Sequence, residues 1–414
     1  ADGSLYTFAM GDPAITQPFI ETGPYPWWTV PDLKIVFFRP LSNILHRMDH
    51  ALFGRHAVYW HLHAMLWYLA MVLLWTLVAR KTLSAPVAAL SAFVFAIDES
   101  HWMPAVWLAN RNALIACVPA LFGLHAHIRW RADKWKPGLP LSIAGYAIGM
   151  LGGEAWLGIA SYVAAYELFG RSDAIKQRAA SLAPAALCAV SYAIAYKVFG
   201  FGVKGSGAYT EPFSALYLAE APGRGLALLG GLLVASPVDT WAFFPEWRWV
   251  LAIPGLAGIA LFGILLRWCW PAIDESDRRA LRWLIPGGLM SLVPVIAAFP
   301  MSRLLLGPSM AASAMVAVLI RHWWTTRKSG RARLAGVACA LLAVVNFVLA
   351  PLGWPIQSAI VMGVGRAMER AYASAPIDDA RAAEQDIYLL AAFDPLTLMY
   401  PPILRRIEGR PLPG

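Results

Sequence analysis

Apolar stretches recur along almost the whole chain, and several approach the roughly 20 residues that a helix needs to cross a bilayer. They run as continuous apolar blocks and do not alternate between two faces, which favours helices over the strands of a membrane barrel. The 414 residues are 59% hydrophobic and 14% charged, with a mean hydropathy of +0.55. The sequence therefore predicts an all-α polytopic membrane protein and excludes a soluble one.

About ten of these stretches are predicted to be transmembrane helices. They cover residues 58–79, 84–97, 105–128, 138–152, 154–170, 179–199, 249–270, 284–299, 303–320 and 334–352. The apolar blocks at 85–97 and 139–151 are short, and blocks of that size are equally typical of re-entrant or buried segments. A further block at 225–235 is too short to cross, so we expect it to be re-entrant or interfacial.

The basic residues between the predicted spans fall into two unequal sets. One set of alternate connections carries seventeen Lys and Arg residues, within 80–81, 129–136, 171–178, 278–282 and 321–333. The opposite connections carry only Lys204, Arg224, Arg248 and Arg303. The positive-inside rule predicts that the first set is cytoplasmic, and the sets alternate only if 225–235 does not cross. Topology thus accounts for the net charge of +9, and no nucleic-acid partner is predicted.

This topology divides the chain into three parts. Residues 1–57 form an outward N-terminal loop, 58–352 the transmembrane domain, and 353–414 an outward tail. In the tail, QDIYLLAAFDPL is typical of a strand after a polar helix, which predicts the start of a soluble α/β domain. An outward residue 1 also leads us to expect a further span upstream of Ala1.

The N-terminal loop contains a helical pattern in LSNILHRMDHALFG. Apolar residues recur there at helical spacing, at Leu41, Ile44, Leu45, Met48 and Leu52. The pattern predicts an amphipathic helix lying along the membrane surface.

Polar residues interrupt the apolar stretch FAIDESHWMPAVWLANRNALIA. Asp98, Glu99 and His101 stand at the outer end of a short span, and Arg111 lies inside the next apolar block. One interpretation is that the carboxylates are solvated at a helix end while Arg111 snorkels or pairs with one of them. The other is functional, because ionisable groups at membrane depth are costly and usually mark a site.

Two further ionisable residues raise the same question. Glu154 follows two glycines where two short spans meet at the outer face, as a loop residue or a cavity-lining carboxylate. Arg303 follows Pro300 at the outer mouth of a span, against the positive-inside pattern. Either a partner carboxylate or an anionic head group is expected to compensate it, since guanidinium binds phosphate oxygens bidentately.

Other sequence patterns point to no cofactor and no metal site. Walker, Rossmann, GxSxG and HExxH motifs are all missing from the sequence. The four cysteines lie inside apolar segments without CxxC spacing, and His46 and His50 alone supply too few ligands for a metal. The glycines at 202, 205 and 207 predict a flexible outward loop.

Several short motifs occur together in a recognisable order. They are Phe38-Arg39-Pro40-Leu41 before the amphipathic helix, the Tyr59/His61 pair, His101, Trp107, Asn110, Arg111 and Glu154. In this order, over roughly residues 36–170, they resemble the integral-membrane GT-C class glycosyltransferases. The nearest are bacterial relatives of the transmembrane and tetratricopeptide-repeat O-mannosyltransferases.

The resemblance implies an enzyme of the bacterial cytoplasmic membrane with its active face outward. Such an enzyme moves a sugar from a polyprenyl phosphate carrier to an acceptor, so its partners are that donor and membrane lipids. The implied catalytic carboxylates are Asp98, Glu99, Glu154 and Asp12. The implied substrate-binding residues are Arg39, His61, His101, Asn110, Arg111 and Arg303.

The chain also departs from these relatives. Met103 stands where they have a glutamate, Gly153 replaces a lysine before Glu154, and the acidic motif expected near the N-terminus is missing, with Asp2 and Asp12 the nearest substitutes. The alternative is therefore a non-catalytic membrane scaffold or a subunit of a membrane complex. A transporter is a weaker alternative, because the two halves of the chain show no internal symmetry.

Overall fold

The computed structural model describes residues 7–21, 25, 27–242, 244–326, 333–374, 377–385, 405 and 409–411. The chain divides into two compact units. The large unit consists mainly of Phe37–Phe201 and Ala208–Trp354, and the small unit of Thr7–Val36, Gly202–Gly207 and Pro355–Gly414.

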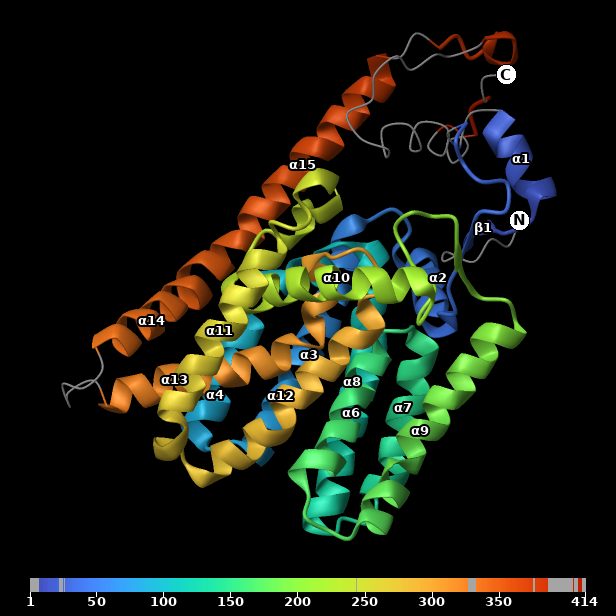
Figure 1. The fold of residues 1–414 in the computed structure, drawn as a ribbon. Helices are drawn as coiled ribbons and strands as arrows, with labels where there is room; N and C mark the ends of the chain where they lie inside the picture. The colour runs from blue at the N-terminus through green and yellow to red at the C-terminus, as the bar shows by residue number, and fades with distance from the viewer. Residues whose placement is uncertain are drawn as a thin grey trace. The chain divides into compact units, whose positions relative to one another are not determined.

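The large unit is helical (Figure 1). Its helices are α2 (Pro40–Phe53), α3 (Ala57–Thr82), α4 (Ala85–Ala96), α5 (Trp102–Val106), α6 (Asn112–Asp133), α7 (Gly138–Gly152), α8 (Trp156–Ala165), α9 (Ile175–Val198), α10 (Ala215–Val234), α11 (Ala252–Cys269), α12 (Glu275–Val295), α13 (Ser309–Thr326) and α14 (Arg333–Val344). Single-turn segments between them include η1 (Glu99–His101), η2 (Leu108–Asn110), the π-helical η3 (Tyr166–Gly170), η4 (Val238–Ala242) and η7 (Ser302–Leu306).

Five helices among the described residues are long and apolar enough to cross a membrane. They are Ala57–Thr82, Leu108–Asp133, Ile175–Val198, Ala252–Ala272 and Gly336–Arg370. These five correspond to five of the ten predicted spans, and their number and apolarity are consistent with an integral membrane protein. The helices α4 and α7 are apolar but shorter, as their sequence blocks indicated.

The remaining predicted spans differ from the helices that form. The span expected at 284–299 belongs to α12, which begins earlier, at Glu275, and carries charged residues in its first turns. The segment 154–170 is divided between α8 and the π-helical η3, and 303–320 between η7 and α13. None of these three regions forms one long apolar helix, so five candidate spans are found among the described residues and the other five stay a prediction.

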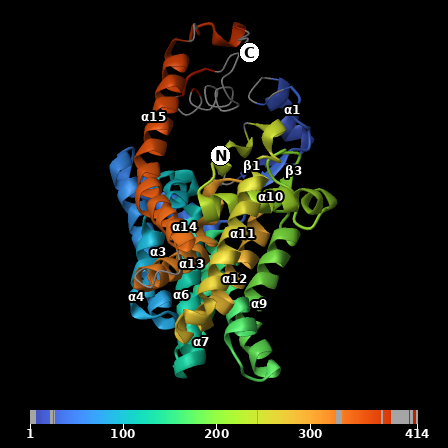
Figure 2. The same ribbon diagram turned by 60° about the vertical axis from the view of Figure 1, so that its left-hand side comes forward.

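Burial varies strongly among the candidate spans. In the most apolar stretch of Leu108–Asp133, 72% of the residues are buried. In the corresponding stretch of Ile175–Val198, which is α9, only 17% of the residues are buried. Views 60° apart both place α9 at the edge of the helices (Figures 1 and 2).

The close packing of α6 on α7 depends on glycine, since a Cβ on Gly145 would lie 2.6 Å from the Pro119 carbonyl oxygen.

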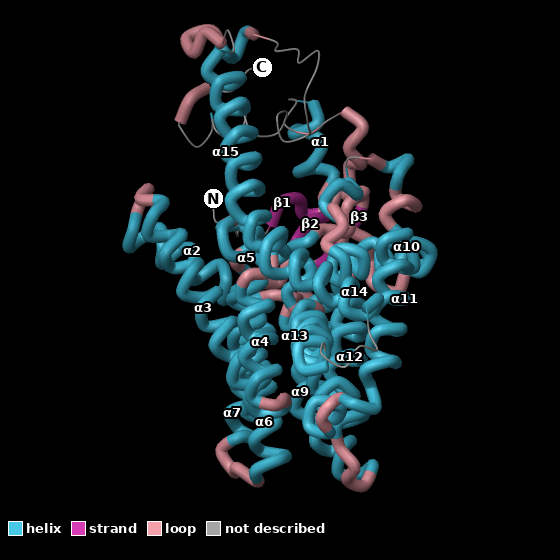
Figure 3. Tube along the Cα trace, turned by 90° about the vertical axis from the view of Figure 1, so that its left-hand side faces the viewer, coloured by secondary structure: helices cyan, strands magenta, loops and turns pink. Residues whose placement is uncertain are grey.

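The helix α10 has an orientation of its own. It runs crosswise to α6 and α7, which stand upright in two views taken 90° apart (Figures 1 and 3). The apolar block 225–235 lies within this helix, and Ser214 caps its start by accepting a hydrogen bond from the Tyr217 backbone N–H. The helix is longer than the block indicated, and it is not among the candidate spans in the described residues.

The small unit contains a three-stranded antiparallel sheet in the order β1-β2-β3. Its strands are β1 (Thr7–Met10), β2 (Lys34–Val36) and β3 (Gly202–Lys204), and α1 (Pro13–Glu21) follows β1. The expectation of a loop at 202–207 is therefore wrong for its first residues, because Val203 pairs with Ile35 and Lys204 forms an ion pair with Asp32.

The expected boundary at 352 falls inside helical structure. The π-helical segment η9 (Val345–Leu349) and α15 (Ala350–Ser374) follow α14, so the chain stays helical to Ser374. The strand expected from QDIYLLAAFDPL falls almost wholly on residues 386–396, which lie outside the described residues.

Candidate functional site

The predicted amphipathic helix forms as α2, and its two faces are reversed relative to a helix of a soluble protein. Its apolar residues Ile44, Met48 and Leu52 are 55%, 49% and 70% exposed. Its polar residues His46 and Asp49 are buried instead. A soluble protein buries the apolar face of such a helix, so this arrangement suits a helix whose exposed face meets lipid.

The buried face of α2 contacts Arg111. This arginine is fully buried, and its guanidinium forms an ion pair with the Asp49 carboxylate. The other Asp49 oxygen lies 2.7 Å from Nδ1 of His63, and the Trp67 indole N–H donates to Nε2 of that histidine over 3.0 Å. Asp49 therefore links α2 to α3 through His63 and to the start of α6 through Arg111, and Arg111 does not pair with Asp98 or Glu99.

Asp49 is a site residue that the sequence analysis missed. Asp49 follows His46 by three residues, so both lie on one face of α2. This spacing is the sequence signal that could have identified Asp49. The face was interpreted as solvent-exposed because it is polar.

Arg39 and Glu154 form a two-pronged ion pair. The Arg39 Nε donates to Glu154 Oε2 over 3.0 Å, and Nη2 donates to Oε1. Glu154 lies in the turn between α7 and α8, after Gly153 with φ +138°. A Cβ on Gly153 would lie 3.0 Å from Arg39 Cγ, so glycine lets Arg39 cross this turn.

The electrostatic surroundings of Glu154 keep its carboxylate charged. Burial alone raises its pKa, but the positive charge and hydrogen bonds of Arg39, together with the charge of Arg303, lower the pKa below its ordinary value. Two cations therefore act on one carboxylate. The three residues together carry one excess positive charge.

Arg303 lies in η7 and is held by aromatic residues. Its guanidinium carbon lies 5.7 Å from the ring centroids of both Trp107 and Phe299, and Nη2 donates to the Tyr209 hydroxyl over 3.4 Å. Its Nε is buried without a hydrogen bond. Among the described residues no carboxylate forms an ion pair with Arg303, in contrast to Arg39.

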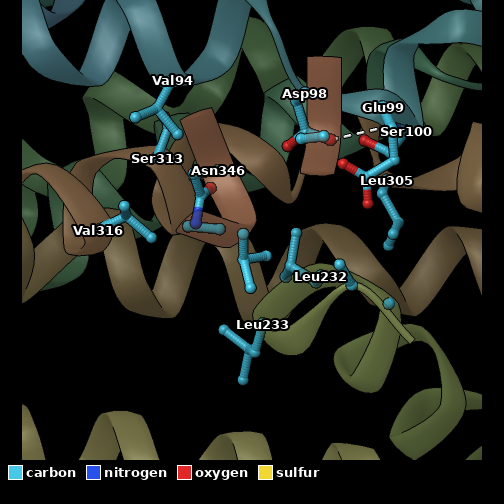
Figure 4. Close-up of a pocket in the computed structure, with 15 residues that line it drawn as sticks. Val94, Asp98, Glu99, Ser100, Leu232, Leu233, Leu305, Ser313, Val316 and Asn346 are labelled. Carbon is cyan, nitrogen blue, oxygen red and sulfur yellow. Dashed lines mark hydrogen bonds between the residues drawn. The ribbon is translucent and has the colours of Figure 1, made fainter. Parts of the chain in front are cut away.

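Asp98 and Glu99 begin the turn that ends α4. The Asp98 carboxylate accepts a hydrogen bond from the Ser100 backbone N–H over 2.9 Å, which caps η1 and stops the preceding helix. Both acids line a cavity together with Leu232 and Asn346 (Figure 4). The cavity measures about 20 Å³, which is room for a water molecule but not for a sugar.

Glu99 has a strongly perturbed acidity. Burial raises its pKa to about 7, and the negative charges of Asp98 and Asp239 add to the effect. A carboxylic acid that titrates near neutral pH is suited to accept or donate a proton there.

The turn η7 carries Arg303 and packs against the segment that carries the acids. It packs against η1, which carries Glu99, and against α5, which precedes Trp107. The Asp239 carboxylate accepts from the Ser302 backbone N–H over 3.0 Å, and Arg303 is the next residue. One short turn therefore contacts an acidic group on one side and carries the guanidinium of Arg303.

The remaining predicted site residues have other surroundings. His101 is fully buried, with Nε2 2.8 Å from the Ser309 hydroxyl and Nδ1 3.1 Å from the Tyr68 hydroxyl, so both ring nitrogens are occupied. Asn110 is buried beside Arg111, and its amide nitrogen has no hydrogen bond. His61 is half-buried on α3, without a hydrogen bond to the described residues.

Asp12 lies in the small unit. Its carboxylate accepts from the Ala14 backbone N–H over 2.9 Å, so it caps the start of α1. This local role accounts for the residue without reference to catalysis.

A second buried polar cluster lies at the other end of α6. Glu167 is fully buried and accepts hydrogen bonds from Arg131 Nε over 2.8 Å and Nη2 over 3.1 Å, and one of its oxygens lies 2.8 Å from His127 Nε2. Arg131 also donates to Asp173 over 2.7 Å. Glu167 lies within an apolar stretch of the sequence, which gives no sign of this cluster.

Comparisons with known proteins give no relative: no family model, no curated protein and no solved structure matches the chain. The described residues contain no group of three or more His, Cys, Asp or Glu side chains that could hold a metal ion.

Proposed function

We propose that the protein is a glycosyltransferase of the bacterial cytoplasmic membrane that moves a sugar from a polyprenyl phosphate donor to an acceptor on the outer side. One observation carries the proposal: Arg303, at the end predicted to face outward, has no carboxylate partner among the described residues and lies in η7, which packs against the segment η1 that carries Glu99. A cation without an ion pair and an acid with a pKa of about 7, on two segments in contact, suit a reaction that needs both groups.

Arg303 supplies the positive charge in this proposal. When the bond between the anomeric carbon and the phosphate oxygen breaks, negative charge develops on the leaving lipid phosphate. A guanidinium held in place stabilises that charge through hydrogen bonds. The aromatic rings of Trp107 and Phe299 hold Arg303 without neutralising it.

Glu99 supplies the base. The acceptor hydroxyl loses its proton to the Glu99 carboxylate while its oxygen attacks the anomeric carbon, and the proton remains on Glu99 until solvent removes it. A pKa of about 7 gives the carboxylate enough basicity for this step at neutral pH. Asp98 holds the η1 turn through its hydrogen bond to Ser100. Since the cavity beside Glu99 admits only a water molecule, the acceptor requires an opening of this region.

The experiment is sugar transfer by membranes that contain the full chain, with a polyprenyl phosphate sugar as donor. Arg303→Ala and Glu99→Gln are expected to lose transfer, while the protein remains in the membrane. Arg279→Ala is the matched control, because that arginine pairs with Glu275 on the exposed start of α12. Full transfer by both site variants would refute the proposal.

A non-catalytic membrane scaffold is the second candidate. The specific observation in its favour is that most of the predicted site residues already have internal partners: Arg39 pairs with Glu154, Arg111 with Asp49, and both nitrogens of His101 are occupied. Copurification of the chain with stoichiometric protein partners, together with no transfer from any polyprenyl phosphate sugar, would favour this candidate.

A further inference from the structure

We propose that Glu154 is an internal occupant of an anion site formed by Arg39 and Arg303, and that a phosphate group of a ligand displaces its carboxylate from Arg39. The inference rests on the proposed function, because it assigns the displaced position to the polyprenyl phosphate, a monoester, that is released when the sugar is transferred. It differs from that proposal in giving Glu154 a competing role, and not a catalytic one.

The first argument is the shape of the ion pair. Arg39 presents Nε and Nη2, two parallel donors on one edge of its guanidinium, to the two oxygens of Glu154. The same edge binds two oxygens of a phosphate equally well. The guanidinium carbon of Arg39 also lies 4.3 Å from the centroid of the Phe37 ring, which holds the side chain in place when its anionic partner changes.

The second argument is the balance of charge. Arg39 and Arg303 together carry two positive charges, and Glu154 is the carboxylate on which both act. The site therefore retains one positive charge, together with the buried Nε of Arg303 that has no hydrogen bond. A phosphate monoester carries more charge and more acceptor oxygens than a carboxylate, so it pairs with Arg39 as Glu154 does and leaves negative charge to act on Arg303, with which Glu154 forms no ion pair.

Glu154 is the more accessible partner of the ion pair with Arg39. The Glu154 side chain is 38% exposed, whereas Arg39 is 12% exposed. Glu154 also lies in a turn, directly after a glycine with φ +138°. A carboxylate that rotates out of the pair therefore leaves the more buried arginine in place.

The experiment measures equilibrium binding to the purified full chain in detergent micelles. The probes are a prenyl phosphate, the corresponding prenol and inorganic phosphate, which separate the contribution of the phosphate from that of the lipid chain. The variants are Glu154→Gln, which keeps the shape of the side chain and removes its charge, and Arg303→Ala. Glu154→Asp is the second variant at position 154, because it keeps the charge and shortens the reach to Arg39.

The inference predicts that Glu154→Gln binds prenyl phosphate about tenfold more tightly than the natural chain, with a smaller gain for Glu154→Asp. An unchanged or weaker affinity in a folded Glu154→Gln protein, while Arg303→Ala still lowers affinity, would overturn the inference and leave the proposed function standing. If Glu154→Gln does not fold, an unchanged or weaker affinity of Glu154→Asp overturns it. Equal binding of prenol and prenyl phosphate to every variant would overturn both.

Discussion

Two arginines near opposite ends of the same pair of helices, α6 and α8, have opposite surroundings. Arg131, at the end predicted to be cytoplasmic, donates to both oxygens of the buried Glu167 and to Asp173. Arg303, beside the start of α6, contacts two aromatic rings and a tyrosine hydroxyl, and pairs with no carboxylate among the described residues. The first guanidinium is saturated with anions and the second is not.

This difference distinguishes an arginine that stabilises the fold, Arg131, from one that is suited to bind an anionic ligand, Arg303. A buried charge is costly unless it is paired and hydrogen-bonded, so saturation is what stability alone requires. Arg131 meets that requirement within the chain. Arg303 lacks an anion of its own, which is the arrangement expected where a ligand supplies the negative charge.

The largest effect on stability is expected at Glu167, which pairs with Arg131. Glu167→Ala leaves the buried Arg131 and His127 without their shared carboxylate. Removing one partner of a buried ion pair costs about 3–5 kcal/mol, so we expect a large fall in the thermal unfolding temperature in detergent. Double variants should show whether the loss comes from the pair: Arg131→Met added to Glu167→Ala should recover part of it. A change of less than about 1 kcal/mol would contradict a structural role.

Substitution of Arg303 should have the opposite effect: a small change in stability and a large loss of sugar transfer. Arg303→Ala removes a guanidinium with no carboxylate to leave unpaired, so we expect little change in unfolding temperature. Sugar transfer, in contrast, should fall about 10²–10³-fold, as for the loss of one donor to a developing negative charge. Unfolding temperature and sugar transfer are measured on the same preparation. An Arg303→Ala protein that loses stability but keeps transfer would make Arg303 a structural cation like Arg131.

The acid beside this end should give the protein an unusual dependence on pH. The pKa of Glu99 in the folded protein, about 7, lies above its ordinary value of 4.5, so the folded state binds more protons between these values. Stability should therefore fall as the pH rises from about 4.5 to 7, by about 1–3 kcal/mol. Glu99→Gln should remove this contribution and be more stable than the natural chain at pH 8. An identical pH profile in the two proteins would contradict the raised pKa.

The smallest effect is expected at Asp12. Asp12→Ala removes the cap of α1, which costs about 1 kcal/mol. Hydrogen exchange should become faster in Pro13–Glu21 only, and sugar transfer should stay at its natural level. A loss of transfer would show that this carboxylate acts in catalysis as well as in capping.

The sequence predicted the helical class well because apolar blocks report burial in lipid or core directly. The helix α2 was predicted from residues 41–52, and the block 225–235 lies in α10, which is not among the candidate spans of the described residues. Five of the ten expected spans form long apolar helices and the other five stay a prediction, because hydropathy does not separate a lipid-facing helix from one buried in protein. The helix α13, which is buried from Ser309 to Ile320, is an example.

The site was harder to predict, since ion pairing depends on contacts between residues far apart in the sequence. Glu154 and Arg303 were recognised as polar residues without a local reason, but the 115-residue separation of Arg39 from Glu154 hid their pairing. Asp49 was overlooked because a polar helix face normally meets water. Only the packing of α2 shows that this face contacts Arg111 instead.

Photocrosslinking tests the central claim most directly. A photoreactive prenyl phosphate added to membranes containing the full chain is predicted to label the peptides that carry Trp107 and Phe299, whose rings flank Arg303, and inorganic phosphate in excess should reduce this labelling. Labelling confined to the other end of α6, around Arg131 and Glu167, or equal labelling by a photoreactive prenol, would contradict a phosphate site at Arg303.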